Sequence, residues 1–318
     1  MLRLLRSNQP IAFATIPVTA LILMVVAVLL DTSSTGLHPS PSWLFASLPK
    51  VDSVWISGLF IAFNGVLFNR LFVRHEIILH RNSLAGWWYV LIASSQFLVA
   101  SFSPILLAHT FTILGLNEAL KVYRENDGAN RYFNAGFLLG CATICSGPFA
   151  ILGLSLIGSV LYTRAANWRE LSLPVIGFLL PFVQFLGILW LLDLPFDTLQ
   201  FGSSDSTLFS WGMEEIVYLA VLFLAVALGF FFMLGTFGSS SNKSKNSKAV
   251  LIIFSVAMVI VAGLLSSYSI RLSLQVLPLV MAWFIPWPFI DAGKRWKNIL
   301  FPLLVLVTLA PFAMRLFA

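Results

Sequence analysis

The most restrictive feature of this sequence is a series of apolar stretches, most of them about as long as a bilayer is thick. A helix needs roughly 17–25 apolar residues to cross a hydrocarbon core about 30 Å thick. Stretches of this kind recur along the whole chain and are separated by short polar segments. The series predicts an all-α, polytopic transmembrane helical bundle with about eleven spans.

The expected spans can be placed from the apolar runs and the breaks between them. The run 132–162 is divided by Gly147-Pro148, which indicates two short spans that form a hairpin. The first run exceeds the roughly 7–15 residues of a secretory signal and lacks an A-x-A site, so we expect a retained span. The expected spans cover 10–30, 53–73, 84–100, 105–120, the two halves of 132–162, 171–192, 215–234, 249–265, 272–290 and 299–316.

Composition supports a lipid environment. Of the 318 residues 59% are hydrophobic and 10% are charged, whereas a soluble domain carries about 25% charged residues. The net charge of +6 does not indicate nucleic acid, because the basic residues are spread over short loops and form no continuous face. We therefore expect membrane lipids as partners and no nucleic acid.

The distribution of basic residues predicts the orientation. With the N-terminus in the cytoplasm, 16 of the 19 Lys and Arg residues fall in cytoplasmic segments, and only Lys50, Arg271 and Arg315 fall on the opposite side. Cytoplasmic loops are enriched in Lys and Arg. The sequence predicts a multi-pass protein of the cell inner membrane, with a cytoplasmic N-terminus and an extracytoplasmic C-terminus.

One polar stretch suggests a division of the chain. The segment 238–248 reads GSSSNKSKNSK, and its small, polar and basic residues are typical of a flexible loop. The expected organisation is a body of eight spans at 1–236, a cytoplasmic linker at 237–248 and three C-terminal spans at 249–318.

Few polar side chains lie deep inside the predicted spans. The main candidates are His109, Asn64 and Gln184. An ionisable group inside a span is a functional hypothesis because its burial is costly. The alternative is that these groups form interhelical hydrogen bonds that fix packing.

No metal or cofactor is expected. Cys141 and Cys145 lie on one face of a helix without a second pair or a histidine nearby, so we interpret them as packing residues. His75 and His80 in RHEIILHR are five residues apart, about 140° around a helix, whereas the metalloprotease motif needs a spacing of four. The sequence also contains no Walker loop, dinucleotide fingerprint or nucleophile elbow.

Carboxylates gather on the predicted outer side. Asp31 follows the first span and Asp52 opens the second, while Asp193 and Asp197 follow the seventh span in DLPFD. Acidic residues favour helix N-termini, which accounts for Asp52 without a chemical role. Asp31 lies at a helix C-terminal end, where a carboxylate is less favourable, and is therefore our first candidate for chemistry.

The middle of the chain resembles a known family. The run 133–183 contains AGFLLG, a Gly-Pro break, and WRE followed by an apolar span with LPFV; RSNQPIAF precedes the first span. In these features the chain resembles an uncharacterised family of polytopic inner-membrane proteins from Bacteroidetes.

AGFLLG followed by a broken hairpin is also similar to the middle of GT-C class glycosyltransferases. Those enzymes take a sugar from a polyprenyl-phosphate carrier at the outer face and use an acidic residue after the first span. The resemblance implies Asp31, with Asp52 in the same loop, as the catalytic carboxylates. The loop 31–52 is shorter than is usual in that class.

Two functional hypotheses follow. In the first, the chain is a GT-C-like transferase of cell-envelope biogenesis in which Asp31 or Asp52 activates an acceptor hydroxyl. Arg271 and Lys50 would then bind the carrier phosphate, with Asp193 and Asp197 as further substrate contacts. In the second, the chain is a non-catalytic membrane subunit or scaffold that binds a protein of an envelope assembly complex. A small-molecule transporter is less favoured because few carboxylates lie inside the spans.

Overall fold

The structure is a computed structural model of the whole chain. We describe residues 2–6, 10–30, 50–78, 82–97, 102–123, 128–163, 168–193, 213–266, 270–290 and 295–317.

The described residues form helices and contain no strand, as expected where lipid cannot satisfy free backbone groups. The N-terminal half contains α1 (Leu2–Arg6), α2 (Pro10–Leu30), α3 (Lys50–Arg74), α4 (Leu84–Phe97), α5 (Pro104–Lys121), α6 (Ala129–Cys145), η1 (Gly147–Ala150) and α7 (Ile151–Thr163). The C-terminal half contains α8 (Trp168–Leu191), α9 (Met213–Gly235), α10 (Asn242–Ser266), α11 (Ile270–Phe284), η3 (Trp287–Phe289) and α12 (Arg295–Phe317).

The predicted all-helical membrane class is confirmed. Each expected apolar stretch coincides with a helix, and α2 has the expected bounds. The predicted break at Gly147-Pro148 is also confirmed, because α6 ends at Cys145 and η1 separates it from α7. Among the described helices, five are long and apolar enough to cross a membrane, so the figure of eleven crossings stays a prediction.

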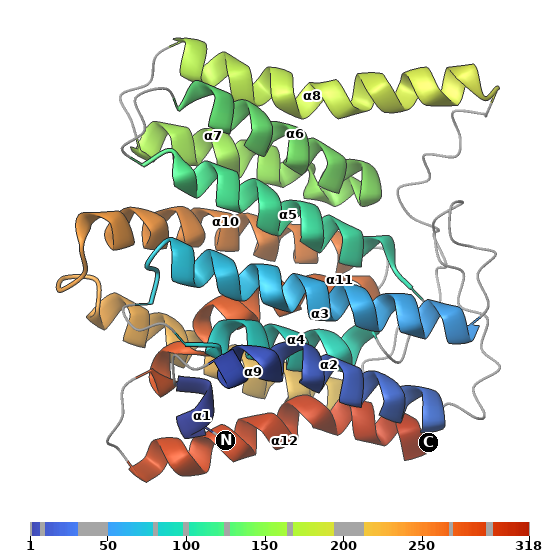
Figure 1. Cartoon of the computed structure of the whole chain (residues 1–318), viewed down its shortest axis with the longest axis vertical. Helices are drawn as coiled ribbons and strands as arrows, with labels where there is room; N and C mark the ends of the chain where they lie inside the picture. Colours follow the sequence, from blue (N-terminus) through green and yellow to red (C-terminus); the bar gives the residue numbers. More distant parts are fainter. Residues whose placement is uncertain are drawn as a thin grey trace.

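Successive long helices alternate in direction, so the bundle has two distinct ends (Figure 1). One end, here called the basic end, collects the last residues of α3 and α5 and the first residues of α6, α8 and α10. At the other, here called the far end, α3, α5 and α11 begin. The described basic side chains at the basic end include Arg74, Lys121, Arg131, Arg169 and Lys243.

The segment expected to be a flexible linker differs in the structure. α10 begins at Asn242, so residues 242–248 form its first two turns, and only the turn 236–241 separates it from α9. These turns are ordered because Ser244, Ser247 and Lys248 are buried against neighbouring helices. The polar residues of this segment therefore make packing contacts.

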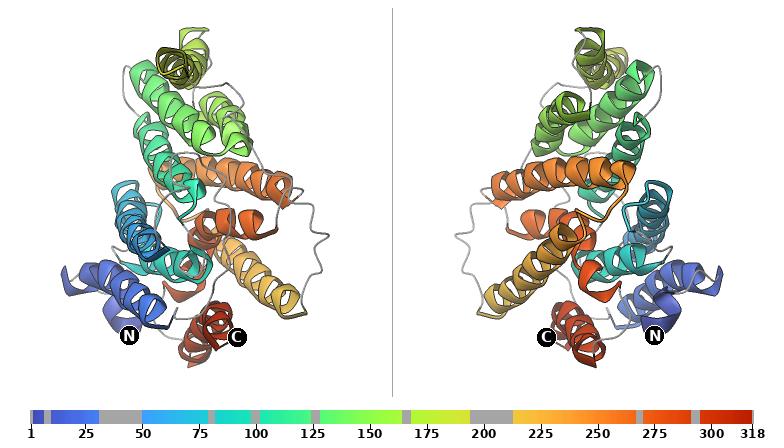
Figure 2. Two further views of the ribbon diagram at one scale, coloured as in Figure 1. Left: turned by 90° about the vertical axis from the view of Figure 1, so that its right-hand side faces the viewer. Right: turned by 90° about the vertical axis from the view of Figure 1, so that its left-hand side faces the viewer.

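The three C-terminal helices pack directly onto the predicted body. α10 lies against α7 and α11, while α11 contacts α4 and α5 and α12 contacts α4. Side views show these helices alongside the N-terminal ones (Figure 2). α4 is the most enclosed long helix, since its described side chains are buried along its whole length.

The peripheral helix α8 is attached mainly through α6. A Cβ atom on Gly136 would lie 2.2 Å from the carbonyl oxygen of Pro174, and one on Gly177 would lie 2.2 Å from that of Phe133. Since such distances are too short for any side chain, glycine is required at this crossing. Close approach of backbones through small residues is typical of helix pairs in membranes.

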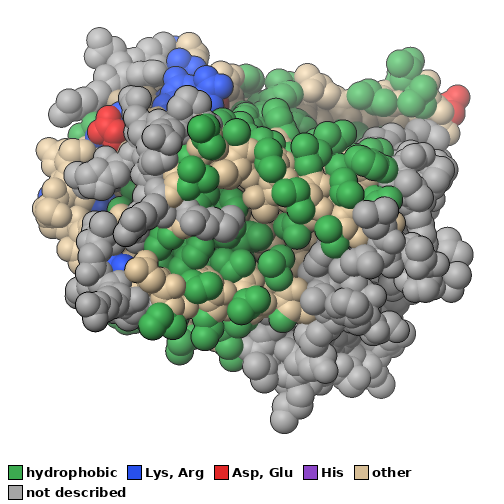
Figure 3. Space-filling view, turned by 60° about the horizontal axis from the view of Figure 1, so that its bottom comes forward, with side chains coloured by type: hydrophobic (Ala, Val, Ile, Leu, Met, Phe, Trp, Pro, Cys, Tyr) green, Lys and Arg blue, Asp and Glu red, His purple; other side chains and the backbone are tan. Residues whose placement is uncertain are grey.

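The exposed surface of α8 is mostly apolar between two aromatic residues. Trp168 and Trp190 lie near the two ends of α8 and are highly exposed. They are 22 residues apart, which corresponds to about 33 Å of helix, close to the hydrocarbon thickness. Figure 3 shows one such apolar face, with basic side chains gathered at one edge. Tryptophan at both interfaces is typical of membrane proteins.

Candidate functional site

The most connected polar groups of the described chain lie along α5. This helix crosses the middle of the bundle and packs against α3, α6 and α11. Its polar side chains contact neighbouring elements at several levels, from the far end to the basic end. We call this set the α5 polar column: Ser103, His109, Thr110, Asn117 and Glu118, with their partners Gln275, Tyr89, Asn64, His75 and Arg131.

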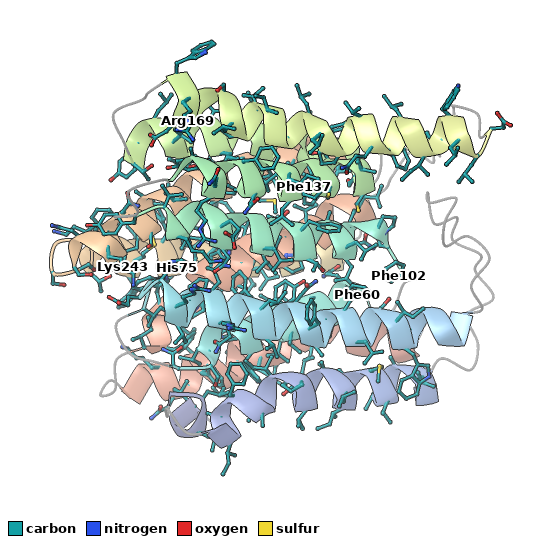
Figure 4. All side chains as sticks on the ribbon, turned by 45° about the horizontal axis from the view of Figure 1, so that its top comes forward. Phe60, His75, Phe102, Phe137, Arg169 and Lys243 are labelled. Carbon is teal, nitrogen blue, oxygen red and sulfur yellow. The ribbon has the colours of Figure 1, made fainter. Side chains whose placement is uncertain are left out.

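At the far end, the column joins α5 to α11. The hydroxyl of Ser103 donates to Oε1 of Gln275 at 2.8 Å, and both residues are buried. Ser103 is also the N-cap of α5, since its oxygen accepts from the N–H of Ile105 at 3.4 Å. The adjacent Phe102 contacts Phe60 of α3 with ring centroids 5.7 Å apart (Figure 4). This junction joins the starts of α5 and α11 to the first half of α3.

In the middle of the bundle, two predicted intramembrane residues belong to the column. Asn64 donates from Nδ2 to the carbonyl oxygen of Leu106 at 3.1 Å and accepts from Thr110 at 2.7 Å. His109 Nδ1 lies 3.0 Å from the hydroxyl of Tyr89. All these side chains are buried, so the geometry matches the packing interpretation of His109 and Asn64.

At the basic end, the column reaches the turn that follows α3. His75 Nε2 lies 3.1 Å from Oδ1 of Asn117, so the imidazole donates from that nitrogen. The side chain is 3% exposed, and burial is the main reason why the pKa of His75 is lowered from 6.5 to about 4. Nearby cations lower that pKa further, whereas the bond to Asn117 raises it. His75 is therefore neutral at pH 7.

An ion pair and a hydrogen bond attach α10 to the turn that follows α3. Lys243 at the start of α10 lies 2.9 Å from Glu76, and Ser247 donates to the carbonyl oxygen of His75 at 3.4 Å. Glu76 has a φ of 52°, a strained value for a residue other than glycine. Figure 4 shows His75 and Lys243 near each other at this end. The turn is thus held between α5 and α10.

A second ion-pair group joins α5 to α6. Glu118 pairs with Lys121 one turn further along α5 and with Arg131 of α6 at 3.0 Å. The Glu118 side chain is 16% exposed, whereas the Arg131 side chain is 39% exposed, so the interhelical pair is only partly shielded from solvent. The two ion pairs leave the Glu118 carboxylate committed to two cations.

Lys248 is a polar contact that the sequence interpretation missed. It lies in the segment expected to be a flexible linker, yet it is fully buried. Its ammonium donates to the Thr236 hydroxyl at 3.1 Å and to Ser240, and it lies 4.7 Å from the ring centroid of Trp287. The lysine joins the end of α9 to η3. A signal was available in the sequence, because Lys248 directly precedes the apolar run of α10.

Three of the candidate catalytic and phosphate-binding residues lie at the far end, in the first turns of α3 and α11. Asp52 and Lys50 belong to the first turn of α3, and Arg271 is the second residue of α11; nothing is described of their side chains. Asp31 and Asp197 lie outside the described residues. Along the helices, Asp52 precedes Phe60 by about 12 Å and Arg271 precedes Gln275 by about 6 Å. The starts of α3 and α11 therefore extend outward from the same junction.

Two other predicted residues lie elsewhere. Asp193 is exposed at the end of α8 with a φ of 50°. α8 packs against α6 and α7 and lies at one extreme of the long axis, away from α2 (Figure 1). Gln184 also lies on α8 and faces outward, so it makes none of the interhelical bonds that we considered for it.

The described residues contain no group of three or more His, Cys, Asp or Glu side chains that could hold a metal ion. Cys141 and Cys145 are free and partly buried on α6. What the described polar groups can do is bond helices to one another and, at the basic end, present cations.

Comparison with known proteins identifies one family. A family model matches residues 1–317 and is described as Family of unknown function (DUF6427). No curated protein and no solved structure matches the chain. Since the matched region covers nearly the whole sequence, the protein belongs to the Family of unknown function (DUF6427).

Proposed function

We propose that this protein is an inner-membrane component of cell-envelope biogenesis, a GT-C-like transferase that uses a polyprenyl-phosphate-linked sugar at the outer face. One observation carries the proposal. The Ser103–Gln275 bond and the Phe60–Phe102 contact join α3, α5 and α11 at the far end. This brings the helix starts that bear Asp52 and Arg271 to one end of the molecule, as a site for an acidic base and a phosphate requires.

The proposed chemistry uses this chain's own residues. Asp31 or Asp52 takes the proton of an acceptor hydroxyl, and the acceptor oxygen forms a bond to the anomeric carbon of the sugar. The bond from that carbon to the carrier phosphate breaks, and the electron pair leaves with the polyprenyl phosphate. Arg271, with Lys50, stabilises the phosphate charge in the substrate and product.

The orientation is part of the proposal. The basic end faces the cytoplasm and the far end faces outward. Because successive helices alternate in direction, described basic residues of five helices lie at one end of the bundle. An excess of Lys and Arg is typical of the cytoplasmic side, which supports this orientation. A lipid-linked substrate then approaches the far end from the outer leaflet.

A second candidate is a non-catalytic subunit or scaffold of an envelope assembly complex. It is favoured by the α5 polar column, in which His109, Asn64 and Glu118 are already bonded to neighbouring helices. In this alternative the interior provides rigidity, and the functional surfaces face a protein partner. The two candidates differ in whether the far-end carboxylates are needed.

The deciding experiment profiles envelope glycans and lipid-linked sugars in a deletion strain. The strain is complemented with wild type, Asp31→Asn, Asp52→Asn, Arg271→Gln or Asp193→Asn at equal protein levels. Asp193→Asn is the matched control. It removes a carboxylate from the same end of the bundle, but α8 packs against α6 and α7, so Asp193, a substrate contact in the sequence-based hypothesis, is not part of the site proposed here. Accumulation of a lipid-linked sugar in the deletion strain would identify the donor.

We expect the deletion to alter the glycans, Asp193→Asn to restore them, and Arg271→Gln to fail. At least one of Asp31→Asn and Asp52→Asn should also fail. Full restoration by both aspartate variants would refute the transferase. Unchanged glycans, together with a stoichiometric copurifying envelope protein, would favour the scaffold.

A further inference from the structure

The outward face of α8 carries a polar side chain in an apolar setting. Gln184 is exposed, and so are Val183 and Ile188 beside it. Six residues separate Gln184 from Trp190, which places the amide about 9 Å inside the level of that aromatic residue. A glutamine side chain is too short to reach the interface from that depth, so its amide lies in hydrocarbon when α8 faces lipid.

Within the described part of the chain, the Gln184 amide has no hydrogen-bond partner. It is the contrast with Asn64 that is informative, since the Asn64 amide is bonded on both sides by Leu106 and Thr110. An amide without a partner in an apolar medium is costly. A helix from outside this chain can remove that cost.

We propose that two copies of this protein associate in the membrane by packing α8 against α8, with the two Gln184 amides hydrogen-bonded to each other across a two-fold axis.

The residues around Gln184 have the spacing that such an interface requires. Leu180, Gln184, Gly187 and Leu191 follow one another at intervals of four, three and four residues, which is the spacing of a helix–helix seam. A Cβ atom on Gly187 would meet nothing within 4 Å, so this side of α8 is open to a close neighbour. The adjacent side of the helix is occupied by α6, which packs at Gly177 and Pro181, one to two turns before Gln184.

The chemistry of the amide selects a second copy as the partner. A carboxamide has both an acceptor oxygen and a donor nitrogen, so two identical amides satisfy each other. All copies of a membrane protein share one orientation, so a two-fold axis along the membrane normal brings each Gln184 to its own mate at equal depth. A two-fold interface of this kind uses the same patch on both subunits.

Crosslinking tests the interface directly. In a Cys141→Ala, Cys145→Ala background, Leu191→Cys places a thiol on the Gln184 face, about 20° from it around the helix. Trp190→Cys is the matched control, because both positions are 75% exposed but Trp190 lies about 120° away from Gln184. In native membranes, oxidation should give a covalent dimer with Leu191→Cys and only monomer with Trp190→Cys. Equal yields at both positions would overturn the proposal.

The role of the amide is tested by Gln184→Leu and Gln184→Asn, each combined with Leu191→Cys. We expect Gln184→Leu to weaken association roughly tenfold, as loss of interhelical hydrogen bonds requires, and Gln184→Asn to retain more of the dimer. Because position 184 faces outward, Gln184→Leu should leave the thermal unfolding midpoint of the detergent-solubilised monomer unchanged. An unaffected dimer with Gln184→Leu, or a crosslink to a different protein, would contradict the proposal.

Discussion

α5 and α8 are both long helices in one bundle, yet they are attached by different means. α5 is held by side-chain hydrogen bonds and ion pairs to several neighbours, at levels from Ser103 to Glu118. α8 is held mainly by the backbone of α6, at Gly136 and Gly177, and leaves most of its own surface outside. In lipid there is little hydrophobic drive between helices, so polar bonds and close packing are the two available means of attachment.

The difference shows what each region can tolerate. A helix fixed by separate polar bonds can lose one of them and remain in place, since each contributes about 1 kcal/mol. A helix that packs through glycine does not tolerate even one such change, because a single added methyl group collides with a carbonyl oxygen. We therefore expect one added methyl group at the glycine contact to cost more than the loss of one polar bond, and the predictions below test that order.

The largest effect is expected from Gly177→Ala. The new Cβ atom would lie 2.2 Å from the Phe133 carbonyl oxygen, so α8 must move away from α6. Overpacking against a rigid backbone should lower the free energy of unfolding by about 3 kcal/mol. SDS titration of the detergent-solubilised protein measures this change. Gly263→Ala is the control, since its Cβ atom would meet nothing within 4 Å. An equal loss of stability in that variant would show that the close contact between α6 and α8 is not what makes Gly177 necessary.

Lys248→Met should have the next largest effect. It removes the bonds to Thr236 and Ser240 and the contact with Trp287, at a cost of about 2–3 kcal/mol. Lys245→Met, one turn earlier and partly exposed, should change the free energy of unfolding little. Limited trypsin digestion should also spare Lys248 and cut after it only in unfolded protein. Rapid cleavage there in the folded protein would restore the flexible-linker interpretation.

The pH dependence of stability reports on the basic end of the α5 polar column. The folded pKa of His75 is about 4 and the ordinary value is 6.5, so below pH 6.5 the unfolded state binds a proton that the folded state excludes. Stability is therefore greatest above pH 6.5 and decreases as the pH falls toward 4, by about 2 kcal/mol between pH 7 and pH 5. His75→Gln should show a smaller decrease in SDS titrations at the two pH values. A parallel decrease in both proteins would exclude His75 as its source.

The smallest effect is expected inside the membrane, and it compares two threonines on one helix. Thr110→Val removes a 2.7 Å bond to Asn64 and should lower the free energy of unfolding by about 1 kcal/mol. Thr112→Val is the control, because the Thr112 hydroxyl is buried without a hydrogen-bond partner in the described chain. It should leave stability unchanged or raise it slightly. If the two variants lose the same amount, hydrogen bonding does not fix α5.

The helices could be predicted from the sequence because their cause is local. The bounds of α2 and the break at Gly147-Pro148 follow from apolar length and from residues that interrupt a helix. The start of α10 could not be predicted in this way. Residues 242–248 have the composition of a loop, and only contacts such as that of Lys248 with Trp287 make them part of a helix.

The candidate site, too, was predictable from the sequence only in part. The sequence indicated which polar residues lie in apolar surroundings, and for His109 and Asn64 the structure supplied the partners. It also showed that Gln184 faces outward, which no single-helix pattern could reveal, since the side of a helix that meets a neighbour depends on that neighbour. The separation of Asp193 from the α3–α11 junction is likewise a matter of helix order in space.

By itself, the sequence determined that this chain is a helical membrane protein, because the length and apolarity of each segment fix how its backbone can be satisfied in lipid. The tertiary structure decided which polar groups are bonded inside the bundle, which helices meet through glycine, and which face of α8 remains open. Those properties depend on pairs of residues far apart in the chain, such as Ser103 with Gln275 and Gly177 with Phe133. They arise only when the helices are packed together.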